Sequence, residues 1–155
     1  MNTAKINNEI NLTYPDSFQE MSEESLKRYY SSAENRWGVY DADRHIVLSV
    51  SWDKAGFFRA MTDAESYMIE VEATLCRSLL NYQRLTSYKL KIGSKKAQGI
   101  RFEYRVRDSV SIHVSDVVVF KYKKHFYAVQ FIMRQTKASE TLPEFDEVLK
   151  SITLG

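Results

Sequence analysis

Apolar and polar residues alternate with a period of two along several stretches of the chain, a pattern typical of half-buried β-strands. Residues 9–15 (EINLTYP) show it, and so do residues 35–41 and 46–52, which the acidic turn DADR joins into a predicted hairpin. Four more strands are predicted between residues 88 and 133. The last two are apolar on both sides in places, which indicates central strands covered on both faces.

A helical period dominates residues 62–82. Thr62 and Glu65 form a capping-box pattern, which predicts that this helix begins at the threonine. Its main apolar stripe consists of Ala64, Met68, Val71, Leu75, Leu79 and Tyr82. A second, weaker stripe consists of Ile69, Ala73, Cys76 and Leu80. Packing under a loop of the same chain is the favoured interpretation of this second stripe, and contact with a partner or a second copy in a homodimer is the alternative.

Two shorter helices are predicted, over residues 21–30 with Ser22 as the N-cap and over residues 141–154 with Thr141 as the N-cap and Pro143 in the first turn. Consecutive strands with tight connections form a mainly antiparallel sheet, and amphipathic helices must cover its faces. We therefore expect an α/β protein of the α+β type, a three-layer α/β/α sandwich, as a single domain over residues 1–155.

Composition narrows the functional classes. The chain has 155 residues, 44% hydrophobic and 27% charged, with a net charge of +2. That charge does not by itself indicate nucleic-acid or membrane binding, so nucleic acid is disfavoured as a partner. The sequence shows neither a signal-peptide pattern nor an apolar run long enough to span a bilayer. Cys76 is the sole cysteine, which excludes an intrachain disulfide, so a cytoplasmic location without membrane attachment is expected.

Candidate catalytic chemistry is sparse. Cys76 is predicted to be a buried structural thiol because it lies mid-helix on the weaker stripe. His45, His113 and His125 lack the spacing of metal ligands, although a pair of them could meet in space. Glycine-rich phosphate-binding motifs do not occur, and the acidic residues fall in solvated turns and helices. We therefore predict no catalytic, metal or cofactor-binding residue, and an enzymatic role is disfavoured.

A surface for partner binding is the remaining candidate site. Basic residues of the predicted strands, with Lys91 among them, could share one sheet face, and aromatic residues gather near the first hairpin. The candidate interaction residues are Trp37, Tyr40, Trp52, Lys89, Arg101, Arg105 and Arg107. The alternatives are a solvated face that prevents edge-strand aggregation, which Glu103 favours, and ordinary packing of the aromatic rings.

Three segments carry a resemblance to a known family. These are INLTYPDSF (10–18), RHIVLSVSW (44–52) and YAVQFIMRQTKASETLPEFDEVLKSITL (127–154), the last with Ser151 and Ile152 at the end of the helix. Together with the order of elements, they resemble the PsbP-like fold family, which includes a Ran-binding nuclear-import factor, and most of all its uncharacterised bacterial members. The resemblance implies a non-catalytic domain that binds an unidentified protein. A small-molecule-binding protein or enzyme with a pocket between sheet and helix is the alternative hypothesis.

Overall fold

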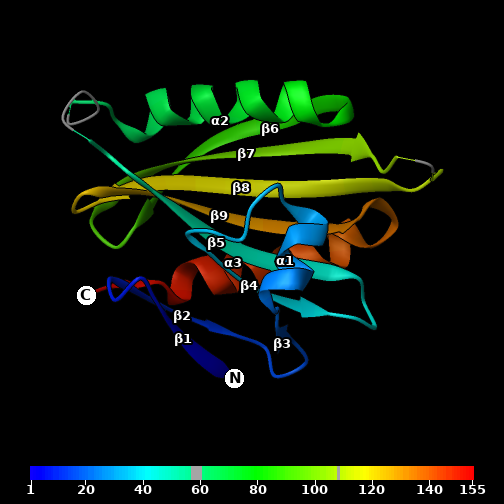
Figure 1. Ribbon diagram of the computed structural model, residues 1–155, viewed down its shortest axis with the longest axis horizontal. Coiled ribbons are helices and arrows are strands. Elements are labelled where there is room, and N and C mark those ends of the chain that lie inside the picture. Colours follow the sequence, from blue (N-terminus) through cyan, green and yellow to red (C-terminus); the bar gives the residue numbers. More distant parts are fainter. Residues whose placement is uncertain (57–60, 108) are drawn as a thin grey trace.

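A seven-stranded antiparallel sheet forms the middle layer of the molecule (Figure 1). The computed structural model describes residues 1–56, 61–107 and 109–155. In spatial order the strands are β3 (Gln19–Glu20), β4 (Arg36–Asp41), β5 (Ile46–Lys54), β9 (His125–Arg134), β8 (Ile112–Tyr122), β7 (Lys95–Arg105) and β6 (Leu80–Ile92). Every neighbouring pair is antiparallel, as the tight connections in the sequence predict.

Helices and a small second sheet cover the two faces. Helix α1 (Glu23–Tyr29) and helix α2 (Ala64–Ser78) pack on one face, which we call the α2 face. The opposite face, called the α3 face, is covered by helix α3 (Ala138–Ser151) and a three-stranded sheet. That small sheet contains β1 (Asn2–Ile6), β2 (Ile10–Tyr14) and β10 (Thr153–Leu154). The expected three-layer α+β sandwich with a mainly antiparallel sheet is confirmed.

Strand β8 shows how the apolar pattern produces these layers. Val117 and Val119 pack into the cluster under α2, whereas Val118 and Phe120 belong to the core on the α3 face. All four side chains are buried. Successive side chains of a strand point to opposite faces, so a strand that is apolar at every position must be covered twice. The central position predicted for this strand is confirmed.

Helix α2 is shorter at both ends than its periodicity predicts. Asp63 is the N-cap, since its carboxylate accepts a hydrogen bond from the Ser66 amide at 2.8 Å, so the predicted start at Thr62 is wrong by about one residue. The helix ends at Ser78, and residues 80–92 form β6. Tyr82 therefore belongs to the strand, where β-favouring residues and pairing with β7 override the helical spacing.

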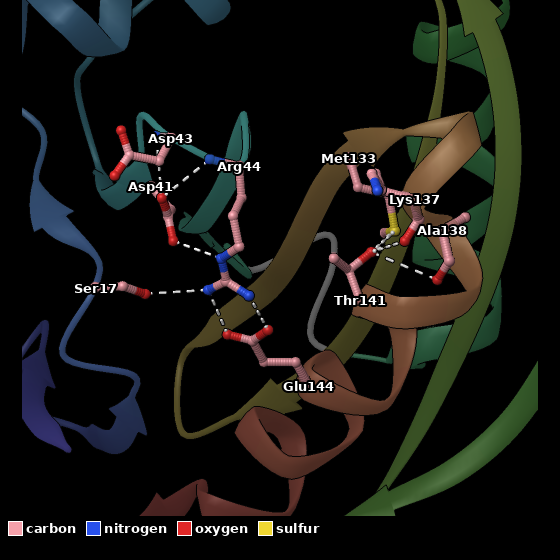
Figure 2. Close-up of polar contacts among 9 residues, drawn as sticks. All are labelled: Ser17, Asp41, Asp43, Arg44, Met133, Lys137, Ala138, Thr141 and Glu144. Carbon is pink, nitrogen blue, oxygen red and sulfur yellow. Dashed lines mark hydrogen bonds and ion pairs between the residues drawn. The ribbon is translucent and has the colours of Figure 1, made fainter.

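Helix α3 begins earlier than expected, after the short 3-10 turn η2 (Gln135–Lys137). Thr141 lies inside the helix and is buried, so the prediction that it caps the helix is wrong. Its hydroxyl donates to the Lys137 carbonyl at 2.9 Å and contacts the Met133 sulfur at 3.0 Å, which ties the helix to β9 (Figure 2). Pro143 is the sixth helical residue rather than part of the first turn.

Candidate functional site

A cavity of about 400 Å³ lies between α1, α2 and the sheet, and we call it the α1–α2 cavity. Figure 1 shows α2 along one side of the large sheet and α1 in front of its other strands. The residues that line the α1–α2 cavity include Tyr29, Tyr30, Arg36, Ser51, Tyr67, Val71, Thr74, Leu75, Ser78, Leu79, Tyr104, Val117, Ala128, Gln130 and Ile132. Side chains of five strands and two helices therefore surround the space, which is in the size range of small-molecule sites.

Arg36 is the cation of this cavity. Its guanidinium carbon lies 3.7 Å from the centroid of the Tyr30 ring, a close stacking distance. Its Nε is shielded from solvent and has no hydrogen-bond partner within the described residues. A buried donor without a partner is costly, so this atom stands out as a group that a ligand could satisfy.

Tyrosines and a few neutral polar groups complete the lining. The Tyr30 hydroxyl lies 2.7 Å from the Ser49 hydroxyl, and the Gln130 amide donates to the Ser115 hydroxyl at 3.0 Å. The Tyr104 hydroxyl makes no hydrogen bond to any part of the chain that the structure describes. The ring of Tyr67 stacks on Phe126 with centroids 4.3 Å apart, which fixes its position at the cavity edge.

Burial shifts the pKa values of ionisable groups that line the cavity. Burial raises the pKa of Tyr104, and it also raises the pKa of Tyr30 despite opposing contributions from Ser49 and Arg36. Both phenols are therefore neutral near neutral pH. Burial lowers the pKa of Arg36, and interaction with Tyr30 offsets part of this effect, so the guanidinium keeps its charge. Among the described lining residues there is no carboxylate or imidazole to act as a general base.

A second cavity, of about 450 Å³, brings two of the histidines together, and we call it the histidine cavity. His45 from the hairpin turn and His113 from β8 both line it. Burial lowers the pKa of His113, and the nearby charges of Arg134 and His45 act in the same direction. Within the described residues no group of three or more His, Cys, Asp or Glu side chains is placed to hold a metal ion.

The outer side of α2 exposes the second apolar stripe. Ile69 is 68% exposed and Leu80 is 46% exposed, and Ala73 and Cys76 between them are also exposed. The expectation that Cys76 is a buried thiol is therefore wrong, and so is the expectation that a loop of the same chain covers the stripe. An amphipathic helix buries its main stripe first, and the weaker stripe here is left at the surface.

The basic residues predicted to share one sheet face are divided between the two faces. Arg101 lies on the α3 face, where its Nε donates to the buried Asp116 carboxylate at 2.7 Å. Lys89 lies on the α2 face, with its ammonium 4.0 Å from the Glu65 carboxylate. The expectation of one common basic face is wrong, because the β6–β7 register pairs Lys89 with Gln98 rather than with an arginine.

The remaining candidate residues are also spread over the molecule. Trp37 and Trp52 are half-buried against the core of the α3 face, and Trp37 packs on the ring of Tyr14 with centroids 5.5 Å apart. Tyr40 packs on the α2 face beside α1. Arg105 is exposed at the end of β7, and Arg107 follows the strand. An interaction role for these seven residues stays a prediction.

The charges of the first hairpin turn form a network of hydrogen bonds and ion pairs (Figure 2). The Asp41 carboxylate accepts hydrogen bonds from the Asp43 and Arg44 amides, as expected for turn chemistry. Arg44 donates to Asp41 at 2.6 Å and binds both oxygens of Glu144 on α3, at 2.6 and 2.9 Å. The arginine therefore joins the hairpin turn to the helix on the α3 face.

Sequence reasoning missed the role of Arg36 and the tyrosines around it. Arg36 precedes Trp37 within a segment that reads as an ordinary strand, and the α1–α2 cavity forms only when α1 and α2 pack beside each other. The one available signal was the tyrosine-rich end of α1, since Tyr29 and Tyr30 are adjacent in the sequence. Tertiary packing, rather than a local motif, creates this site.

Comparisons with known proteins identify the fold. No family model matches the sequence, and no protein of curated function matches it. Cyanobacterial PsbP (CyanoP) from Synechocystis sp. PCC 6803 superposes with a TM-score of 0.71 at 11% identity, over 99% of this chain and 92% of that one.

Two further solved structures are similar. The Ran-binding protein Mog1p of Saccharomyces cerevisiae gives a TM-score of 0.63 at 10% identity, over 99% of this chain and 96% of that one. A Pseudomonas aeruginosa protein of unknown function, PA94, described as a putative regulator, gives 0.63 at 11% identity, over 97% of this chain and 94% of that one. The resemblance predicted from the sequence is confirmed at the level of architecture, and the chain has the PsbP-like fold.

Proposed function

We propose that the chain is a non-catalytic protein–protein interaction module of the cytoplasm. The observation that carries this proposal is the exposed apolar stripe of Ile69, Ala73, Cys76 and Leu80 on and just beyond α2. Such a stripe on the outer side of a helix is a typical contact for a partner. Mog1p, which shares the fold, is described as Ran-binding, and this supports protein partners only by analogy of fold.

One further observation is compatible with this role. Strand β6 is one edge of the sheet, and it carries Lys89 and Lys91. Its pairing with β7 is interrupted by register shifts. Bulges and lysines discourage strand addition at an edge, which leaves side-chain surfaces as the means of contact. Among the described residues, no helix is both long and apolar enough to cross a bilayer.

Affinity enrichment from lysate of the source organism tests the proposal. The bait is the full chain, and the test variant is Ile69→Lys, which places a charge in the middle of the stripe. Ser139→Lys is the matched control, because it adds the same charge at an exposed position of α3. We expect one protein to be enriched by wild type and control and reduced at least tenfold by Ile69→Lys, and the purified pair to reproduce this order.

Other outcomes decide against this surface or identify its occupant. Equal enrichment by all three baits would show that the stripe is not the contact. Sedimentation equilibrium of the purified chain adds the second test. Self-association that is lost in Ile69→Lys would identify the partner as a second copy of the chain.

Small-molecule binding is the second candidate function, and the α1–α2 cavity favours it. The cavity has a suitable volume, an apolar wall and a cation with an unsatisfied donor. A thermal-shift panel of metabolites tests it, since a ligand that binds only the folded state raises the melting temperature in a saturable way. A panel in which no compound stabilises the chain would contradict this function.

A further inference from the structure

The charge of the α1–α2 cavity is unbalanced. Arg36 contributes one positive charge, and no Asp or Glu is among the described residues that line the cavity. The guanidinium also forms no ion pair within 4.0 Å to a described carboxylate. A shielded cation without a counter-ion is compensated when an anionic ligand enters.

The shape and lining of the cavity indicate the rest of the ligand. Val71 and Leu75 of α2 and Ile132 of the sheet supply apolar surface. Tyr29 and Tyr104 add aromatic rings to those of Tyr30 and Tyr67. Flat rings pack favourably against such aromatic surfaces, whereas a purely aliphatic wall would give no preference for them. A volume of about 400 Å³ suits a ligand with one or two rings.

We propose that the α1–α2 cavity binds a small aromatic monocarboxylate, with its ring among the tyrosines and its carboxylate at the Arg36 guanidinium. The inference rests on the second candidate function and names the ligand class for that cavity. The planar guanidinium suits a carboxylate because two parallel N–H donors can meet its two oxygens. The Tyr104 hydroxyl is a further donor in the lining that is not used by other described residues.

Other charged ligands fit this lining less well. A phosphate monoester carries a charge of about −1.5 to −2 near neutral pH, which a single guanidinium cannot balance. A cationic ligand would be repelled by Arg36, and the lining offers it no described carboxylate. One negative charge on an aromatic body is therefore the combination that the cavity accommodates.

Isothermal titration calorimetry on the full chain tests the inference. The probes are phenylacetate, 3-phenylpropanoate and indole-3-acetate, each paired with its neutral amide. We expect at least one carboxylate to bind wild type about tenfold or more tightly than its amide, since a charged hydrogen-bonded pair contributes that much. The comparison of acid with amide uses only wild type, so it is decisive even if a variant fails to fold.

Variants locate the binding site. Arg36→Met should weaken carboxylate binding about tenfold to a hundredfold and leave amide binding unchanged. Lys150→Met is the control, because it removes one positive charge from an exposed residue of α3 that does not line the cavity, and it should leave both affinities unchanged. Leu75→Trp, which fills the cavity, should abolish binding of both probes.

The outcomes separate the inference from the function on which it rests. Amides that bind as tightly as carboxylates, or an Arg36→Met variant with unchanged carboxylate affinity, would overturn the ligand class while small-molecule binding stands. Binding of a cationic or phosphorylated metabolite in the thermal-shift panel, with none of the carboxylates bound, would also overturn the ligand class and leave small-molecule binding supported. An absence of binding by the probes and by every panel compound would overturn both.

Discussion

Among the described residues, one partly buried arginine lies on each face of the large sheet, and the two arginines have very different surroundings. Arg101 on the α3 face donates two hydrogen bonds to Asp116, and Tyr88 donates a third to the same carboxylate. Arg36 on the α2 face stacks on Tyr30 and has an unsatisfied Nε. The first charge is neutralised within the fold, whereas the second remains available to a ligand.

The two faces of the large sheet also differ in how continuous their apolar packing is. Buried residues on the α3 face form one continuous cluster that joins the large sheet, α3 and the small sheet. Buried residues on the α2 face form two separate clusters, one under α2 and one under α1. The α1–α2 cavity lies between these helices, so we expect the α3 face to dominate stability and the α2 face to serve binding.

The largest expected effect of a substitution is on the α3 face. Phe131 is fully buried and stacks on Phe145 with centroids 5.1 Å apart. Phe131→Ala should lower the free energy of unfolding by about 3–5 kcal/mol, whereas Ile132→Ala, the next residue of β9 but facing α1, should cost about 2 kcal/mol. Urea unfolding measures both losses. Equal losses would show that the α3 face does not contribute more to stability than the α2 face.

The two arginines give the next largest difference. Arg101→Met should cost about 3 kcal/mol, because it leaves the carboxylate of Asp116, which is 1% exposed, without its cation. Arg36→Met should cost less than about 1 kcal/mol, since no carboxylate loses a partner. Denaturant unfolding of both variants provides the measurement. A larger loss for Arg36→Met would show that its charge stabilises the fold.

Two valine substitutions on β8 should differ less in their effect on stability, but they are better matched because each removes the same atoms. Val118→Ala on the α3 face should lower the free energy of unfolding by about 2 kcal/mol, from lost burial and a new void. Val117→Ala removes the same atoms beside the existing cavity and should cost about 1 kcal/mol less. Thermal unfolding followed by circular dichroism compares them, and the reverse order would mean that the cavity wall is the better packed region.

The smallest expected effect depends on pH. Burial alone would raise the pKa of Asp41, but hydrogen bonds from Arg44 and Ser17 outweigh it and hold the pKa below its usual value of 3.8. A lowered pKa contributes stability above about pH 4, and that stability is lost as the pH falls through the folded-state value. Arg44→Met should therefore cost about 1 kcal/mol at pH 7 and progressively less below pH 4.

Urea unfolding at a series of pH values checks this dependence. Arg28→Met is the control, since its ion pair with Glu24 is exposed and 4.0 Å long, and it should show almost no effect at any pH. A loss for Arg44→Met that is constant down to pH 3 would show that the arginine acts through packing rather than through its ion pairs with the Asp41 and Glu144 carboxylates.

Much of the architecture could be predicted because apolar periodicity reports burial directly. The hairpin of β4 and β5, the two-sided burial of β8 and the antiparallel order all follow from the pattern. Two features escaped it for physical reasons. Strand β1 has the mostly polar sequence NTAKI and is held by pairing with β2, and β10 has only two residues. Such strands depend on their neighbours rather than on their own composition.

The candidate site was less predictable than the fold. The main apolar stripe of α2 was predicted correctly to include Val71 and Leu75. Periodicity could not show that these two residues would line a cavity instead of a packed core. Arg36 lies opposite Ser51, and Tyr104 lies on β7 with three strands between it and the strand of Arg36, so their positions depend on register across the sheet. A single sequence without a local motif does not specify such distant juxtapositions.

The small sheet on the α3 face has a consequence for synthesis of the protein. Strand β2 is made before the strands of the large sheet, yet its neighbours β1 and β10 lie at opposite ends of residues 1–155. Helix α3 and strand β10 cannot dock until residues 138–154 have left the ribosome. Until then, the apolar side chains of β2 and of the α3 face of the large sheet remain uncovered. The core of the α3 face is therefore completed late, and chaperones can bind the exposed strands until α3 and β10 dock.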